Sequence, residues 1–167
     1  MRGPTAFEDR RDAGRQLATR LPPSTERTPI VLAMPRGGVP VADEVAAALG
    51  APLDLIVVRK IGCPWQPELG LGAIAEGGVL ILNDALIHDL GVRRDELDAA
   101  TLAEQEELDR RIRRYRGDRP RSPLEGRDVI LVDDGLATGY TARAAIGAIR
   151  RAGAGRVTLA VPVAPPS

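Results

Sequence analysis

Residues 129–141 read Val-Ile-Leu-Val-Asp-Asp-Gly-Leu-Ala-Thr-Gly-Tyr-Thr, and this stretch decides the fold. Its first four residues are apolar and mostly β-branched, a pattern typical of a strand that is buried on both faces of a parallel sheet. Two acids follow, then a loop of small and hydroxylated residues, then a helical pattern over Ala142–Ala152. We therefore predict a strand, a ligand-binding loop and a helix N-terminus in direct succession.

The acids and the loop suit two halves of one ligand. The carboxylates of Asp133 and Asp134 can accept hydrogen bonds from a vicinal diol, while the free N–H groups and positive dipole end of a helix bind phosphate. A phosphate beside a diol indicates a ribose phosphate. The alternative is an ordinary strand-to-helix turn with two solvated acids. The loop residues that let the backbone approach the phosphate closely are Gly135, Ala137, Thr138, Gly139 and Thr141.

The same run resembles the signature that binds phosphoribosyl pyrophosphate (PRPP) in the type I phosphoribosyltransferases. That signature consists of apolar residues, two acids, a short small-residue loop and a Thr or Ser at the helix start, all of which are present. The resemblance implies that residues 133–141 bind PRPP, Tyr140 included. Many family members carry a small residue at the position of Tyr140, so the direction of its side chain is left open.

A second turn, Pro35-Arg36-Gly37-Gly38-Val39-Pro40, leads from a short apolar stretch into a predicted helix over Val41–Leu49. Adjacent glycines permit unusual backbone angles and expose N–H groups, and Arg36 adds a fixed positive fork. We predict a second anion site here, with an ordinary turn and an exposed arginine as the alternative. The run Arg36-Gly37-Gly38 resembles the loop that holds the pyrophosphate of PRPP in xanthine-guanine transferases.

Leu53–Val58 has the pattern of another buried strand and ends in two cations, Arg59 and Lys60. Open α/β sheets bind ligands at the carboxyl ends of their strands, so these cations are predicted to face the pyrophosphate. Lys60 is the single lysine among 23 basic residues, which favours a position that needs a compact ammonium. The run from Arg59 to Pro64 also resembles the start of the mobile catalytic loop in adenine-type transferases. A solvated strand end is the alternative.

Residues 62–82 are rich in Gly and Pro and are predicted to form a flexible loop that closes over substrate, with a hairpin through Gly77-Gly78. Trp65 either shields the site from water or anchors the core. Cys63 has no identifiable base beside it and is interpreted as a bystander rather than a nucleophile. Residues 70–75 match a dinucleotide-binding fingerprint, but two prolines lie where the preceding strand would have to be, so we reject the match.

The composition excludes several classes of protein. The 167 residues suit a single domain over 1–167, and the 23 acidic and 23 basic residues balance, so bulk charge predicts neither nucleic-acid nor membrane-surface binding. With one cysteine and one histidine, His88, a disulfide framework or a Cys/His metal site is not expected. No run approaches the ~18 apolar residues of a membrane span. We expect a soluble, cytoplasmic protein.

A helical insertion is predicted over residues 83–121, with a short helix capped by Asn83 and a long helix from Asp95 to about Arg116. The tail of this insertion, residues 110–121, holds seven arginines, which raises the alternative of an RNA-binding segment. A solvated helix end in an arginine-rich chain is favoured, because only one aromatic residue is interleaved. Nucleic acid is therefore not expected as a partner.

Strands that alternate with helices predict an α/β fold, a doubly wound and mostly parallel sheet with flanking helices and a small hood or flexible-loop region. The resemblance spans nearly the whole chain, from the opening run Phe7-Glu8-Asp9-Arg10 onward, and points to a bacterial group of predicted phosphoribosyltransferases. Such proteins usually continue beyond the last predicted strand, Val157–Val163, so the chain is expected either to lack part of the acceptor pocket or to leave a sheet edge for a partner chain to cover. We expect a homo-oligomer such as a dimer.

The resemblance implies transfer of 5-phosphoribosyl from PRPP to a nucleobase-like acceptor, with release of pyrophosphate, in nucleotide salvage. Asp133 and Asp134 would stabilise positive charge on the ribose, and Arg59 and Lys60 would stabilise the leaving group. The implied cofactor is Mg²⁺, held through PRPP and water with the two aspartates as optional ligands. No covalent enzyme nucleophile is needed.

Two rival functions use the same residues. A PRPP-sensing regulator would keep the binding loop without catalysis and bind nucleic acid through residues 110–121, but the retained Arg59-Lys60 pair argues for chemistry. A phospho-acceptor module would be phosphorylated on Asp133 or Asp134. It is the weaker rival, because receiver-like folds place their acid pair early in the chain and here the pair comes late.

Overall fold

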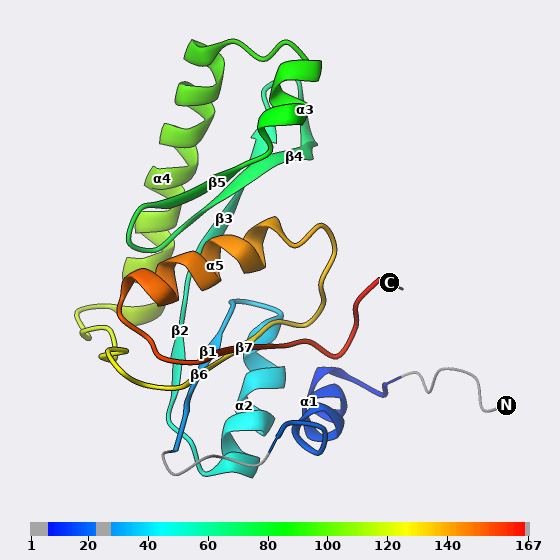
Figure 1. The fold of residues 1–167 in the computed structure, drawn as a ribbon, viewed down its shortest axis with the longest axis vertical. Helices are drawn as coiled ribbons and strands as arrows, with labels where there is room; N and C mark the ends of the chain where they lie inside the picture. The colour runs from blue at the N-terminus through cyan, green and yellow to red at the C-terminus, as the bar shows by residue number, and fades with distance from the viewer. Residues whose placement is uncertain (1–6, 23–27, 166–167) are drawn as a thin grey trace, which may run out of the picture. The chain divides into compact units, whose positions relative to one another are not determined.

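The computed structural model describes residues 7–22 and 28–165. Its contacts divide the chain into two compact units. The first consists of Met1–Leu55, Pro123–Ala137 and Ala152–Ser167, and the second of Ile56–Ser122 and Thr138–Arg151. Each unit has its own sheet, and Figure 1 labels the elements of both. The single-domain assignment stays a prediction.

The sheet of the first unit is parallel throughout. Its four described strands lie in the order β2-β1-β6-β7, so β6 occupies a central position. Every residue of β6 is buried, as its apolar sequence predicts. The bounds are β1 (Ile30–Ala33), β2 (Leu53–Leu55), β6 (Val129–Val132) and β7 (Val157–Ala160).

Two helices of this unit pack against each other. The helix α2 (Gly38–Leu49) packs on β1 and ends at Gly50, whose φ of 58° suits glycine. The helix α1 (Arg10–Ala18) lies beside α2 (Figure 1). Gly14 permits this approach, because a Cβ there would lie 2.7 Å from the Val41 carbonyl oxygen. The amide of Asp12 donates to Asp9, which caps α1.

The second unit contains an antiparallel sheet of three described strands, β3 (Val58–Cys63), β4 (Gln66–Ala75) and β5 (Val79–Leu82). The hairpin predicted through Gly77-Gly78 is confirmed, and both glycines have positive φ. The predicted irregular loop is wrong for residues 66–75, which form a regular strand. A Cβ at Gly72 would lie 2.2 Å from the Ile81 carbonyl oxygen, so this glycine permits close strand pairing rather than flexibility.

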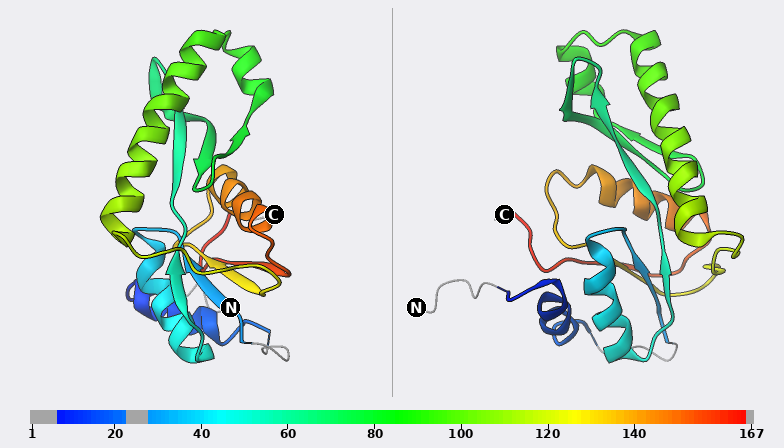
Figure 2. Two further views of the ribbon diagram at one scale, coloured as in Figure 1. Left: turned by 90° about the vertical axis from the view of Figure 1, so that its left-hand side faces the viewer. Right: turned by 180° about the vertical axis from the view of Figure 1, so that it is seen from behind.

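Three helices complete the second unit among the described residues, and all three were predicted. Asn83 caps α3 (Asp84–Asp89) by accepting from an amide at 3.2 Å. The long helix α4 (Arg94–Arg116) packs along β3 (Figure 2), and its Leu108 is fully buried. The helix α5 (Tyr140–Arg151) packs against β4 and β5.

A buried ion pair joins the end of β4 to the end of α4. Glu76, directly after β4, and Arg116, the last residue of α4, are 8% and 9% exposed. Arg116 donates from both Nη atoms to the Glu76 carboxylate. The Val57 amide donates to the same carboxylate at 3.4 Å. Glu76 therefore connects α4 to the start of β3.

Three predictions about local structure need correction. The strand predicted over residues 53–58 is two strands in different sheets, so Arg59 and Lys60 lie inside antiparallel β3 rather than beyond a parallel strand. Trp65 is 55% exposed and is not a core anchor. Residues 70–75 lie inside the regular strand β4, so they do not form the turn of a dinucleotide-binding motif. The motif was rightly rejected, but the reason given, the lack of a preceding strand, was wrong.

In the part of the chain that the structure describes, no helix is both long and apolar enough to cross a bilayer.

Candidate functional site

The carboxyl ends of β1 and β6 lie side by side in the first unit. Ala33 pairs with Val132 in the parallel register, and the Met34 amide donates to the Val132 carbonyl at 2.9 Å. The turn after β1 and the acids after β6 therefore share one edge of the sheet, where open α/β sheets bind ligands. The structure thus brings together two of the predicted anion-binding segments, residues 36–38 and 133–135.

Two glycines bring the turn directly against the acids. A Cβ at Gly37 would lie 2.1 Å from Oδ2 of Asp134, and a Cβ at Gly38 would lie 3.0 Å from Cα of Asp133. A Cβ at Gly38 would meet backbone atoms, and a Cβ at Gly37 would displace the Asp134 carboxylate, so this contact depends on both glycines. The peptide between Pro35 and Arg36 is cis, and the Arg36 residue is exposed.

Asp134 has an arginine partner that the sequence interpretation missed. Arg10, the first residue of α1, donates to Oδ2 of Asp134 from Nε at 2.9 Å and from Nη2 at 2.8 Å. The two residues are 124 positions apart, so no local pattern links them. The only signal was that Arg10 belongs to the opening run shared with the resembling family. One carboxylate of the pair is therefore neutralised by the N-terminal helix.

Asp133 has a different environment. Its Oδ1 accepts the amide of Asp134 at 2.8 Å. Burial raises the pKa of Asp133 to about 6, and the neighbouring charge of Asp134 adds to the rise, while the backbone hydrogen bond opposes it. The two adjacent carboxylates therefore differ in charge state. Asp134 is ion-paired with Arg10, whereas Asp133 gains a proton in weakly acidic solution.

The raised pKa of Asp133 predicts a pH-dependent stability. Between its ordinary value of 3.8 and its folded value of about 6, the folded chain keeps a proton that the unfolded chain has released. The contribution of Asp133 to stability is therefore fully present below pH ~4 and is lost as the pH rises through ~6. After allowance for solvent screening, we expect Asp133→Asn to gain roughly 1–2 kcal/mol relative to wild type over this range. Urea unfolding at several pH values checks it, and a constant difference would contradict it.

Alanine at the two glycines should have separable effects. Gly38→Ala forces a Cβ to within 2.8 Å of the Val132 carbonyl oxygen, a backbone atom, so the free energy of unfolding should fall by about 1–3 kcal/mol. Gly37→Ala meets the end of the Asp134 side chain, which can rotate away. We expect this variant to keep most of its stability and to lose affinity for a diol ligand. Urea unfolding and ligand titration measure the two effects, and the reverse order would contradict the geometry.

The loop that follows the acids continues into the second unit. The Leu136 amide donates to the Val163 carbonyl at 2.9 Å within the first unit. Thr138–Thr141 belongs to the second unit, where Tyr140 opens α5 and Gly139 has a φ of 79°. The Arg143 guanidinium lies 5.8 Å from the centre of the Tyr140 ring. The Tyr140 side chain therefore lies along its own helix, toward the next turn.

Arg59 and Lys60 line a hollow of about 460 Å³ in the second unit. Arg59 Nε donates to Oε2 of Glu104 at 2.8 Å, and Lys60 Nζ donates to the Glu68 carbonyl at 2.6 Å. Each cation thus has an acceptor within its own unit. Cys63 also lines the hollow and is almost fully buried. The assignment of the two cations to pyrophosphate stays a prediction.

The acid pair suits a magnesium ion that arrives with a phosphate ligand. Among the described residues, no group of three or more His, Cys, Asp or Glu side chains could hold a metal. Asp133 and Asp134 offer hard carboxylate oxygens, the type that Mg²⁺ prefers, and Mg²⁺ commonly takes its remaining ligands from substrate phosphates and water. The residues therefore fit a substrate-borne Mg²⁺ rather than a dedicated protein cage.

Comparison with known proteins decides the family. The family profile described as Phosphoribosyl transferase domain matches residues 10–167. The chain belongs to this family. The match includes the turn after β1, the acid pair and Arg10. The observed α/β architecture, a mostly parallel sheet with flanking helices, confirms the predicted fold class of a type I phosphoribosyltransferase.

Two Mycobacterium tuberculosis proteins are similar to this phosphoribosyltransferase chain. They are MT0597 of strain CDC 1551 / Oshkosh and Rv0571c of strain ATCC 25618 / H37Rv, both provisionally named phosphoribosyl transferases. Each is 52% identical over 159 residues, which cover 95% of this chain and 36% of the mycobacterial protein. The chain therefore spans about a third of the length of these relatives.

Solved structures extend the comparison. The protein TT1426 from Thermus thermophilus is 46% identical, with a TM-score of 0.77 over 96% of this chain and 76% of that chain. A hypoxanthine-guanine phosphoribosyltransferase (hpt-2) from Bacillus anthracis str. 'Ames Ancestor' is 12% identical, with a TM-score of 0.55 over 99% of this chain and 75% of that chain. The second likeness is one of fold.

Proposed function

We propose that this chain transfers the 5-phosphoribosyl group of PRPP to a nucleobase-like acceptor and releases pyrophosphate. The observation that carries the proposal is the contact between the Gly37-Gly38 turn and the Asp133-Asp134 pair at neighbouring strand ends. A carboxylate pair beside the N-terminus of α2 suits a ligand that has both a diol and phosphates, because carboxylates accept from hydroxyls and a helix N-terminus favours an anion. Membership of the phosphoribosyltransferase family supports the same ligand.

The ribose is assigned to the acid pair. The carboxylates of Asp133 and Asp134 accept hydrogen bonds from the two ribose hydroxyls, and such bonds to charged groups are the stronger kind. Arg10 occupies Oδ2 of Asp134 in the structure, so the diol either shares that carboxylate with the guanidinium or displaces it. As the bond from C1 to the pyrophosphate oxygen breaks, the nearby negative charge stabilises the cationic ribose.

The 5-phosphate is assigned to the loop and helix start that follow the acids. Residues 137–141 form a continuous stretch that ends in the first turn of α5, and the free N–H groups and dipole of a helix N-terminus favour an anion. The hydroxyls of Thr138 and Thr141 add donors. Gly135 and Gly139 leave the backbone unshielded. Tyr140 lies beside Arg143 and contributes its backbone amide.

The leaving pyrophosphate is assigned to the turn after β1, where Arg36 is exposed beside Gly37 and Gly38. The role of Arg59 and Lys60 toward the pyrophosphate stays the prediction from the sequence, and each has an acceptor in its own unit, the Glu104 carboxylate and the Glu68 carbonyl. Asp133 and Asp134 are the carboxylates open to a Mg²⁺ ion held through PRPP and water, and such an ion would supply charge neutralisation of the phosphates. A ring nitrogen of the acceptor then attacks C1, and no covalent enzyme intermediate forms.

Pyrophosphate release tests this function. The folded chain, supplied with PRPP, Mg²⁺ and a panel of purines and pyrimidines, should release pyrophosphate with at least one base. The Asp134→Asn variant under the same conditions provides the background rate. No release above that background with any base, from a sample that shows cooperative unfolding, would count against the transferase.

The regulator alternative has less support in the structure. Its nucleic-acid segment would be the arginine-rich residues 110–121, yet Arg116 is buried against Glu76, and Arg110 and Arg111 both pair with Glu107. These arginines already have carboxylate partners, which reduces the free positive charge available to a phosphate backbone. The transferase therefore remains the proposed function.

The setting of the reaction is part of the proposal. The parallel sheet has β2 and β7 as its edges among the described strands, and an open edge favours pairing with a second copy. We therefore propose a homodimer. The proposed location is the cytoplasm, and the proposed pathway is nucleotide salvage. Light scattering of the eluting protein measures the mass directly.

A further inference from the structure

Arg10 binds one oxygen of a carboxylate that we assign to the ribose. Its Nε donates to Oδ2 of Asp134 at 2.9 Å, and its Nη2 lies 2.8 Å from the same oxygen. An ionised carboxylate offers about four acceptor positions over its two oxygens. Arg10 takes positions on Oδ2 only, so this contact leaves Oδ1 of the same carboxylate to a ligand.

The turn after β1 lies against the same oxygen. A Cβ at Gly37 would lie 2.1 Å from Oδ2 of Asp134 and 2.9 Å from Oδ1, so Oδ2 is the oxygen closer to the turn. Oδ2 therefore has two neighbours, the Gly37 backbone and the Arg10 guanidinium. A rotation of the Asp134 side chain away from the turn would break its contacts with Arg10, so the arginine holds the carboxylate in the observed orientation.

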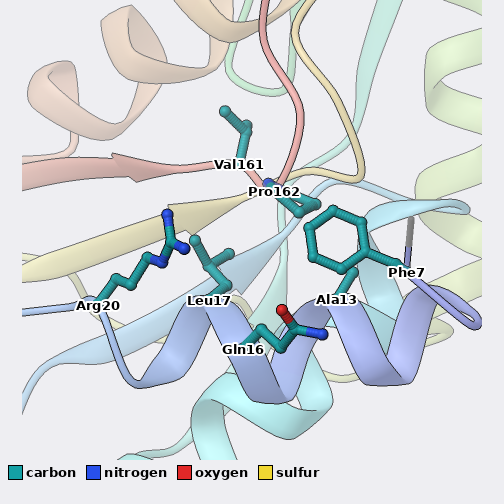
Figure 3. A pocket seen from close by; sticks show the side chains of 7 residues that line it. All are labelled: Phe7, Ala13, Gln16, Leu17, Arg20, Val161 and Pro162. Carbon is teal, nitrogen blue, oxygen red and sulfur yellow. The ribbon is translucent and has the colours of Figure 1, made fainter. Parts of the chain in front are cut away.

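The helix that carries Arg10 is itself fixed by packing within the first unit. On one side, Gly14 lets α1 approach a backbone carbonyl of α2. On another, Leu17 points toward Val161 and Pro162, the segment after β7, across a hollow of about 110 Å³ (Figure 3). The Arg10 guanidinium is therefore presented from a backbone position that packing defines, although its own side chain is 61% exposed.

We propose that Arg10 is a positioning residue for the ribose. It stays on Oδ2 of Asp134 when PRPP binds and so presents Oδ1 to a ribose hydroxyl. This inference rests on the proposed transferase function. The diol shares the carboxylate rather than displacing the guanidinium, because displacement would exchange a bond between two charged groups for one to a neutral hydroxyl, and the charge-assisted bond is the stronger kind.

The fixed carboxylate also serves the transfer step. As the bond from C1 to the pyrophosphate oxygen breaks, positive charge grows on the ribose. A charged group that is already oriented stabilises this charge without reorganising during the reaction. Arg10 acts only through Asp134, so loss of Arg10 should weaken PRPP binding and lower kcat without removing a contact to the phosphates.

Matched arginine variants and two ligands test the inference. By calorimetry with Mg²⁺, Arg10→Met should bind PRPP ~3–10-fold more weakly than wild type, a loss no greater than that of a hydrogen bond to a charged group. Inorganic pyrophosphate has no diol, so its affinity should be unchanged. The control is Arg15→Met on the same helix, because Arg15 is 53% exposed and lies 3.6–3.7 Å from Glu44 and Asp12. It should bind both ligands as wild type does.

A double-mutant cycle separates positioning from a general structural effect. In the Asp134→Asn background, Arg10→Met should cause no further loss of PRPP affinity, because the carboxylate through which Arg10 acts is already absent. An effect on folding or on the shape of the site would instead lower the affinity by the same factor in both backgrounds. Additive losses would therefore overturn the inference.

The remaining outcomes are distinct from failure of the proposed function. If wild type binds PRPP and Arg10→Met binds it equally or more tightly, Arg10 has no positioning role or is displaced by the ligand, and the inference alone is overturned. An equal loss of pyrophosphate affinity would show that Arg10 contacts phosphate, which overturns it as well. Absence of PRPP binding by folded wild type overturns the transferase and this inference with it.

Discussion

Replacing Asp134 with asparagine should lower kcat/KM for phosphoribosyl transfer by about 10²–10³-fold, the range seen when one preorganised electrostatic group is removed from an active site. The substitution removes a negative charge that we assign to the ribose site and leaves Arg10 without its ion partner. Arg10 and Asp134 have side chains that are 61% and 35% exposed, so the stability cost should stay below ~1 kcal/mol. Pyrophosphate release and urea unfolding measure the two effects.

The control for this variant is Asp98→Asn. Asp98 is also an exposed carboxylate that pairs with an arginine, Arg94, at 3.0 Å, but it lies on α4 within the second unit. We expect its removal to leave the transfer rate at the wild-type value. Equal activity of Asp134→Asn and Asp98→Asn would show that the acid after β6 takes no part in the chemistry.

Glu76→Gln should be the most destabilising of the substitutions considered, with a loss of about 3–5 kcal/mol in the free energy of unfolding. The variant leaves the Arg116 guanidinium buried without its carboxylate and weakens the acceptor for the Val57 amide. Glu76 connects the end of α4 to β3 and β4, so the second unit should lose its cooperativity first. Urea unfolding followed by circular dichroism measures the change.

Two further variants separate the charge effect from packing. Glu76→Leu combined with Arg116→Met should recover much of the loss, because a buried ion pair can often be replaced by apolar residues of similar volume. Glu107→Gln removes the half-buried partner of Arg110 and Arg111 and should shift the unfolding midpoint much less than Glu76→Gln. A Glu76→Gln midpoint equal to that of Glu107→Gln would contradict the role of the buried pair.

The central elements of the fold could be predicted because their sequence patterns are local. The four apolar residues of β6 are buried on both faces as expected, and α2 and α5 follow their loops at the positions that small residues and helical spacing indicate. The hairpin at Gly77-Gly78 was also visible, since adjacent glycines tolerate positive φ. Each of these features depends on residues close together in the chain.

The strand β4 was missed because its glycines are required by close contacts with neighbouring strands, which the local sequence does not show. Pro67, Gly70 and Gly72 make the stretch resemble a loop, yet the space beside each glycine is occupied by a neighbour. A Cβ at Gly72 would meet the Ile81 carbonyl oxygen at 2.2 Å, and one at Gly70 would meet Cε of Lys60 at 2.7 Å. Glycine in a strand then marks close approach rather than flexibility, and the sequence alone does not distinguish the two.

The ion pairs were missed for the same physical reason. Arg10 and Asp134 are 124 residues apart, and Glu76 and Arg116 are 40 apart, so no spacing rule links either pair. Among 22 arginines in an evenly charged chain, neither Arg10 nor Arg116 is distinguishable by composition. The acid pair and the Gly37-Gly38 turn were predictable as anion sites, but the contact between them follows only from the parallel pairing of β1 with β6.

The most direct measurement is a calorimetric titration of the folded wild-type chain with PRPP and Mg²⁺, run in parallel with Asp134→Asn. We predict saturable one-to-one binding by wild type and an affinity about tenfold or more weaker in the variant, as expected for lost hydrogen bonds to a charged group. Absence of binding by wild type, or equal affinity in the two proteins, would contradict a PRPP site at the Asp133-Asp134 pair.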